Sequence, residues 1–262
     1  MLNSLKIIIL ILALIVLVSP AAPISSKDTE AFTDAGVFAL MSKEYARAHE
    51  LFEKAAKAGN PHAQTLLAGL YIDGLGVSQN YVKARYWLEK GAKAGNNQAQ
   101  FTLGVLYENG IGGPQDYKKA RYWHFKAVES GNIPAALNLG TLYYEGKGGP
   151  KDIKQAIKLW EKVATYPDEI KLDGIDGKIH AQNNLGLVYF YNKDYEKARY
   201  WFEKAAEVNE EAQLALGFIY FNGLGVPQNL KKSRYWIEKF VDRNVNINLQ
   251  MALTLSFSLF KN

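Results

Sequence analysis

The sequence predicts an all-α fold, a right-handed α-solenoid of about six helix–turn–helix repeats. Three observations predict it: an internal repeat of 36 residues, apolar residues at helical spacing within each repeat, and glycines at regular places where helices should end. A single pair of helices cannot bury its apolar face, whereas stacked pairs can, so the repeats should form an array. Stacking also explains the aromatic content of 13%, because tyrosine and tryptophan fill the layers between helices.

Each repeat opens with an Ala-x3-Leu-Gly-x2-Tyr block or a close variant. The alanines that open these blocks are Ala63, Ala99, Ala135, Ala181 and Ala212, and a weaker copy starts at Ala31. A second block, Arg-Tyr-Trp, begins at Arg85, Arg121, Arg199 and Arg234. Because the first block of the third repeat has Leu103 and Tyr107 on one helical face, each repeat should be a pair of helices joined by a turn.

Turn and cap residues place the helix ends in that third repeat. Gly110 and Gly112 should end the first helix, because glycine tolerates the left-handed conformation of a helix end. Asp116 is then in position to cap the second helix, which carries Ala120, Trp123 and Ala127 and should end at Gly131.

Glycine also recurs inside the first helices, where it costs about 1 kcal/mol relative to alanine. The positions are Gly104, Gly140, Gly186 and Gly217. Because the glycine occupies the same position in several aligned repeats despite this cost, the two helices of a repeat should approach closely there. We expect the tryptophan of the Arg-Tyr-Trp block to lie at a position that packs between helices, and its arginine to extend outward over the surface. If there were room, Gly104→Ala would stabilise the helix.

The amino terminus has the pattern of a secretory signal. Residues 7–18 are twelve uninterrupted apolar residues, and Ser19, Pro20, Ala21 and Ala22 supply a helix breaker and a small-residue cleavage site. The alternative is an uncleaved membrane anchor over residues 7–24, although twelve apolar residues are short for a span that needs about 20. Either alternative places the rest of the chain outside the cytoplasm, secreted or periplasmic, or anchored to the inner membrane.

The predicted segments follow one another along the chain. They are a signal peptide at 1–22, a degenerate first repeat at 27–60, repeats two and three at 61–96 and 97–132, a fourth repeat with an inserted loop at 133–179, a short fifth repeat at 180–209, a sixth repeat at 210–243, and a capping helix at 244–262.

The third unit, Ala99 to Val128, carries the pattern Ala-x3-Leu-Gly-x2-Tyr-x2-Gly-x-Gly with Lys-Ala-x2-Trp in its second half, and the second unit, Ala63 to Ala94, matches it closely. This pattern resembles the Sel-1-like repeat, a relative of the tetratricopeptide repeats, as found in exported bacterial proteins. The first and fifth units lack Gly-x-Gly and are closer to the plain tetratricopeptide length. The resemblance covers about residues 30–245 and implies a superhelical array that binds other proteins.

The spacing between the fourth and fifth repeats is ten residues longer than normal, through an insertion at 166–178. Its acidic residues lack the alternating pattern of a calcium loop, so a solvated surface loop is expected, with contact to a partner as an alternative.

Catalytic and metal-binding patterns are missing from the sequence. There is no Gly-x-Ser-x-Gly, His-Glu-x-x-His or phosphate-loop motif, there is no cysteine, and the four histidines lie in different repeats. We therefore expect no enzyme activity, no cofactor and no metal. The excess of 31 Lys and Arg over 26 Asp and Glu is small and spread along the chain, which also argues against nucleic acid as a partner.

The concave surface formed by the first helices is the remaining candidate site. The positions of the first helices that should line this surface, which we call the concave columns, are mostly apolar, as in grooves that bind a partner helix or an extended peptide. The residues are Thr65, Ile72, Phe101, Val105, Glu108, Leu137, Thr141, Tyr144, Asn183, Leu187, Phe190, Leu214, Phe218 and Phe221. The alternative for each is packing between neighbouring first helices. We expect large anchors such as Phe190 and Phe218 to dominate binding without being needed for folding.

The sequence thus favours a non-catalytic scaffold of the cell envelope or the secreted space that binds an unidentified protein. The alternative is a cell-wall or glycan-binding envelope factor, because exposed tyrosine and tryptophan can stack on sugars and the positive net charge of +5 favours anionic wall polymers. A role in host interaction is implied only by the family resemblance.

Overall fold

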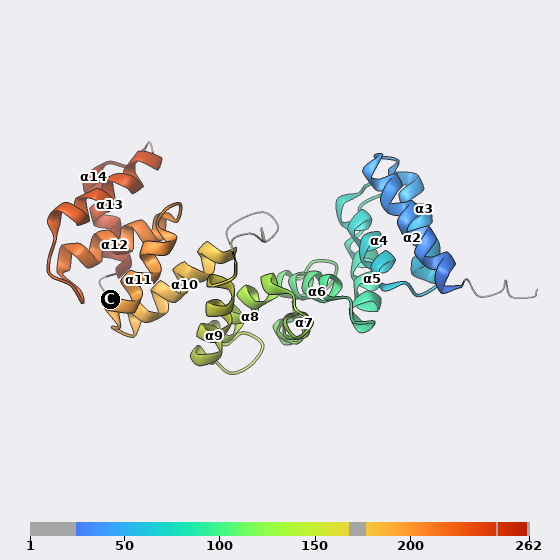
Figure 1. Ribbon diagram of the computed structural model, residues 1–262, viewed down its shortest axis with the longest axis horizontal. Helices are drawn as coiled ribbons and strands as arrows, with labels where there is room; N and C mark the ends of the chain where they lie inside the picture. The colour runs from blue at the N-terminus through green and yellow to red at the C-terminus, as the bar shows by residue number, and fades with distance from the viewer. Residues whose placement is uncertain (1–24, 168–176, 245, 261–262) are drawn as a thin grey trace, which may run out of the picture. The chain divides into compact units, whose positions relative to one another are not determined.

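The computed structural model describes residues 25–167, 177–244 and 246–260, and every regular element in them is an α-helix. The signal pattern and most of the 166–178 insertion therefore lie outside the described residues. The chain divides into two compact units, residues 1–96 and 97–262. The first unit contains α2 (Ser26–Met41), α3 (Tyr45–Lys57), α4 (Pro61–Asp73) and α5 (Tyr81–Lys93). The second contains α6 (Asn97–Asn109), α7 (Tyr117–Glu129), α8 (Ile133–Glu145), α9 (Ile153–Ala164), α10 (Gly177–Tyr191), α11 (Tyr195–Ala205), α12 (Glu210–Asn222), α13 (Leu230–Arg243) and α14 (Leu249–Phe260) (Figure 1).

The helices pair in chain order as the repeats predict. The first helix of each repeat packs on the second, as α2 does on α3, α6 on α7 and α12 on α13. Within each unit, second helices also pack on the next first helix, as α3 does on α4 and α9 on α10. The array of helix pairs is the α-solenoid expected from the sequence.

The glycines inside the first helices mark where the two helices of a repeat meet. A methyl group placed on Gly104 would lie 2.6 Å from Cε1 of His124, and one placed on Gly140 would lie 2.6 Å from Nε1 of Trp160. The same contact recurs in other repeats, between Gly36 and Phe52, Gly186 and Phe202, and Gly217 and Ile237. The expected close approach is confirmed, and it leaves no room for a larger residue at these glycines.

The tryptophan of Arg-Tyr-Trp is buried at Trp87 and Trp201, but it is not the residue that packs on the glycine. The residue that meets the glycine is the one after the tryptophan position, such as His124 after Trp123 and Phe202 after Trp201. One residue along a helix is a rotation of about 100°, so the tryptophan turns toward the edge of the helix pair. Trp123 is accordingly only half-buried, whereas His124 is fully buried, with 0% of its surface exposed.

Two of the arginines in these blocks also depart from the prediction that they extend outward. Arg85 is 9% exposed. The guanidinium of Arg121 lies 3.8 Å from the ring centroid of Tyr143, and its Nη1 donates a hydrogen bond to the carbonyl of Pro150 at 3.1 Å. Arg121 therefore joins its own repeat to the next, while the side chain of Arg234 remains exposed.

Caps and turns follow the sequence signals. The side chain of Asp116 accepts a hydrogen bond from the amide of Lys119 at 3.0 Å, as predicted for the cap of α7. The second glycine of the Gly-x-Gly turn has a further task, because Gly148, at φ 73°, lies directly against the backbone of Tyr117 at the start of α7. This turn therefore needs glycine both for its left-handed backbone and for contact with the preceding repeat.

The recurring tyrosine of the first helices contacts the second helix of the preceding repeat. The hydroxyl of Tyr220 donates to Glu203 at 2.8 Å, and that of Tyr189 donates to Glu161 at 3.4 Å. Partial burial is the main cause that raises the pKa of Tyr189 above its ordinary value, so the hydroxyl remains protonated and keeps its role as a donor. These contacts tie α10 to α9 and α12 to α11, the second helices of the preceding repeats.

Candidate functional site

The predicted concave columns remain partly accessible in the first half of the second unit. Phe101, Val105 and Glu108 on α6 are half-buried, and so are Leu137, Thr141 and Tyr144 on α8. Thr65 and Ile72 on α4, in the first unit, are also half-buried. Each unit thus has partly accessible apolar residues with scattered polar groups on its first helices.

Polar atoms at this surface are tied to the second helices behind it. Oε2 of Glu108 lies 3.2 Å from Nε2 of His124. The indole Nε1 of Trp160 donates to the carbonyl of Leu137 at 3.2 Å, and the ammonium of Lys151 lies 4.5 Å from the ring centroid of Tyr144. These contacts hold the surface residues in place from behind, which is the preorganisation that a binding surface needs.

Asn183 is buried rather than open to solvent. Its Nδ2 donates to Oε2 of Glu211 at 2.7 Å and so connects α10 to α12. Its Oδ1 is buried and has no hydrogen-bond partner among the described residues. Asn183 therefore acts in this structure as a link between two neighbouring first helices.

At the carboxyl-terminal end, the chain's own α14 covers the predicted columns. Phe190, Leu214 and Phe218 are buried in a hydrophobic core, while Leu187 and Phe221 are half-buried at its edge. Phe257 of α14 lies against Phe218 and Phe221, with ring centroids 5.2 and 5.1 Å apart. The expectation that Phe190 and Phe218 are unnecessary for folding is therefore not supported, because both belong to the packed core.

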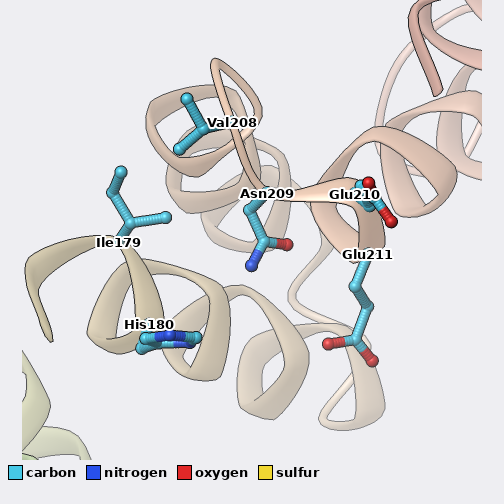
Figure 2. Close-up of a pocket in the computed structure, with 6 residues that line it drawn as sticks. All are labelled: Ile179, His180, Val208, Asn209, Glu210 and Glu211. Carbon is cyan, nitrogen blue, oxygen red and sulfur yellow. The ribbon is translucent and has the colours of Figure 1, made fainter. Parts of the chain in front are cut away.

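A hollow of about 400 Å³ lies between the start of α10 and the start of α12. It is lined by Ile179, His180, Val208, Asn209, Glu210 and Glu211, and the side chains of Asn209 and Glu211 extend toward α10 (Figure 2). Oδ1 of Asn209 already caps α12 through the amide of Ala212 at 2.8 Å, and Glu211 holds Asn183. Sequence reasoning missed this hollow, because its residues come from two repeats.

The inserted loop begins and ends close together. Nζ of Lys178 donates to the carbonyl of Tyr166 at 3.1 Å. Gly177 and Lys178 already belong to α10, so the loop predicted over 166–178 is shorter than expected at its carboxyl end.

The histidines of the described residues stand apart from one another. Nε2 of His49 lies 3.1 Å from the hydroxyl of Tyr71, His124 contacts Glu108, and His62 and His180 are exposed at helix starts. Within the described part of the chain, no three His, Cys, Asp or Glu side chains come close enough to hold a metal ion.

The second helices present a repeated aromatic feature. Tyr86, Tyr122, Tyr200 and Tyr235 are each 51–55% exposed. Each meets the following tryptophan edge to face, with ring centroids 4.9–5.1 Å apart. The tyrosine of Arg-Tyr-Trp is thus a surface residue in all four blocks.

Stacked helix pairs with an apolar first-helix surface define a helical-repeat protein of the protein-interaction class. Models of the Sel1 repeat match residues 36–60, 61–96, 97–132, 133–165 and 210–245, and a tetratricopeptide repeat model matches 179–212. The chain belongs to the Sel1 repeat family. The tetratricopeptide character expected for the fifth unit is confirmed, whereas residues 36–60 of the first unit match the Sel1 model.

The solved structures that are similar to this one include two that are 30% identical to it in sequence. A protective antigen present in uropathogenic Escherichia coli strains, which displays an SLR fold, is 30% identical with a TM-score of 0.71; the match covers 82% of this chain but only 46% of that one. A Sel1 repeat protein from Oxalobacter formigenes is 30% identical with a TM-score of 0.69, covering 87% of this chain and 88% of that one. No curated protein matches the chain. Sel1 repeats generally mediate protein–protein interaction and form scaffolds of a non-catalytic type.

Proposed function

We propose that this chain is a non-catalytic scaffold that acts outside the cytoplasm and binds a partner helix or extended peptide on the concave surface of its first helices. The observation that carries the proposal is the pair of half-buried apolar columns on α6 and α8, represented by Val105 and Leu137. A surface that is apolar, partly accessible and held from behind by hydrogen bonds is suited to recognition of another protein.

A photo-crosslinking residue placed at Val105 or Leu137 should form an adduct with one protein in the envelope fraction of the native cell. The same residue at Tyr122, on the second-helix face, should give none, because that face lies behind the proposed site. Leu137→Asp should then remove the adduct formed from Val105, since a carboxylate in an apolar contact is costly to desolvate. Adducts from Tyr122 alone, with each protein folded by thermal melt, would place recognition on the other face.

Location outside the cytoplasm is supported by the apolar residues 7–18 and the small residues after them. We expect the exported protein to have a mature amino terminus between Ala22 and Lys27. Amino-terminal sequencing measures this directly, and recovery of Met1 would favour the membrane anchor instead. Among the described residues, no helix has both the length and the hydrophobicity to span a bilayer.

The second candidate is a glycan-binding envelope factor, which the four half-exposed tyrosines of the second helices favour. Replacement of all four tyrosines, Tyr86, Tyr122, Tyr200 and Tyr235, by alanine should then prevent co-sedimentation with cell-wall sacculi, because the aromatic faces that stack on sugars are lost. Unchanged co-sedimentation, or none by the unaltered chain, would leave the protein-binding scaffold as the better proposal.

A role in host interaction rests on one relative only. The uropathogenic Escherichia coli protein is a protective antigen, and this chain spans 46% of its length. For this chain we propose, in addition to its function as a scaffold, that part of its surface is accessible to host molecules.

A further inference from the structure

Helix α14 starts like the first helix of another repeat but packs differently. Oδ1 of Asn248 accepts from the amide of Met251 at 2.9 Å, as Asn209 does for Ala212 in α12. Eight residues after the cap, α12 has Gly217, which faces its own second helix at Ile237. The same position in α14 is Ser256, whose hydroxyl donates to the carbonyl of Leu214 on α12 at 3.1 Å. Thus α14 turns toward α12 the face that a complete repeat reserves for its second helix.

This orientation puts α14 on the predicted concave columns. Phe260 packs against Phe190 and Phe218, with ring centroids 5.3 and 6.0 Å apart, and Phe257 packs against Phe218 and Phe221. The small residues Ala252 and Ser256 are buried, which allows the helix backbone to come close to α12.

Apolar contacts supply most of what holds α14 in place. Residues 249–260 contain no charged side chain, so no ion pair ties the helix to the rest of the unit. Its outer face is apolar as well, because Met251, Leu255 and Leu259 are 53%, 40% and 45% exposed. A helix with this composition is held mainly by shape and hydrophobic burial, together with the hydrogen bond from Ser256 to Leu214, and another helix of the same kind can make the same contacts.

We propose that α14 is a tethered occupant of the concave surface, and that the partner is an uncharged helix of the same chemistry that takes its place on α10 and α12. The inference rests on the proposed function and specifies the partner. The binding face of that helix has small residues four apart, as at Ala252 and Ser256, and phenylalanines three apart, as at Phe257 and Phe260. A tethered helix acts at an effective concentration in the millimolar range, so it competes strongly with a free one.

The experiment uses the full chain and a fluorescent peptide with the sequence of residues 246–262. The host chain carries Phe257→Asp and Phe260→Asp, which remove its own helix from the site. The peptide should bind this variant at least about tenfold more tightly than the unaltered chain, because the tethered competitor is gone. Fluorescence anisotropy measures both affinities. A peptide with Phe257→Ala and Phe260→Ala should not bind.

The matched control is Met251→Asp with Leu255→Asp, which puts the same charges on the exposed face of α14. It should leave α14 seated and peptide binding as weak as in the unaltered chain. Equal peptide affinity for all three chains would overturn the proposal, and so would dimers of the Phe257→Asp, Phe260→Asp chain or of the unaltered chain in ultracentrifugation, since α14 would then serve a second copy.

A second variant covers the case in which the charged host does not fold. A protease site inserted after Asn244 leaves every contact of α14 intact, and cleavage removes only the tether. The cut helix should then exchange with the labelled peptide during size-exclusion chromatography. A cut helix that stays bound without exchange would overturn the proposal, while crosslinking from Val105 and Leu137 would still test the proposed function independently.

Discussion

Replacing Phe218 by alanine should lower the free energy of unfolding of the second unit by about 3–5 kcal/mol, the usual cost of removing a buried phenylalanine. Phe218 is buried on α12, and its ring meets Phe190, Phe257 and Phe260 at centroid distances of 6.1, 5.2 and 6.0 Å. Urea unfolding followed by circular dichroism measures the change.

Phe125→Ala is the matched control, because it removes the same side chain from a position on α7 that is exposed. Its effect should stay within about 0.5 kcal/mol, as for most surface substitutions. If Phe218→Ala proved as mild as the control, Phe218 would be a surface anchor, as the sequence alone suggested, and α14 would not be part of the core.

Gly104→Ala should destabilise the chain, whereas Gly69→Ala should stabilise it. A methyl group on Gly104 would lie 2.6 Å from Cε1 and 2.7 Å from Nδ1 of His124, whose ring is fully buried and has nowhere to move. We expect a loss of about 1–3 kcal/mol from overpacking, and a larger loss for Gly104→Leu. Gly69 lies inside α4 with nothing within 4 Å of a methyl group, so alanine there should gain about 1 kcal/mol of helix propensity.

The opposite signs make the pair of glycine substitutions informative. Thermal and urea unfolding of the two single variants are compared under the same conditions. A gain in stability for both would mean that the glycine column faces open space and that the helix contact in the structure is misplaced.

Most of the fold could be predicted because the repeat supplies independent signals that agree. The alanine, leucine and tyrosine columns set the helical face, Gly110 and Asp116 set the turn, and Gly104 identified the close approach of the two helices. These signals depend on backbone geometry and local hydrogen bonds, which individual residue types such as glycine and aspartate indicate directly.

The residue of the second helix that meets the glycine could not be predicted, for a physical reason. Trp123 and His124 are adjacent, and tryptophan is the larger apolar residue, so hydrophobicity favours the wrong one. Whether Trp123 or His124 meets Gly104 depends on the rotation of α7 about its axis. The sequence does not determine this rotation, because α7 packs against helices on two sides. His124, buried with Nε2 against Glu108, carries no sign in its residue type that it belongs to the core.

The carboxyl-terminal part of the candidate site could not be predicted at all. Phe190 and Phe218 have the same pattern whether a partner, a neighbouring helix or the chain's own end covers them. The coverage by α14 depends on a contact such as Ser256 to Leu214, 42 positions apart in the chain, which no local spacing reveals. Val105 on α6 and Leu137 on α8 are partly accessible, and their role in binding stays a prediction.

The glycine contact has an implication for how such an array can diverge. Phe52, His124, Trp160, Phe202 and Ile237 differ in shape, polarity and aromaticity, yet each packs on a glycine of the first helix. A glycine surface imposes little side-chain chemistry of its own, so the position opposite it can vary among bulky residues. The first-helix position is restricted to small residues, glycine in these repeats and the buried Ala68 in α4. Divergence at this contact should therefore be one-sided, with the second-helix residue varying more than the first-helix residue that it packs on, and duplicated or deleted helix pairs should still fit their new neighbours.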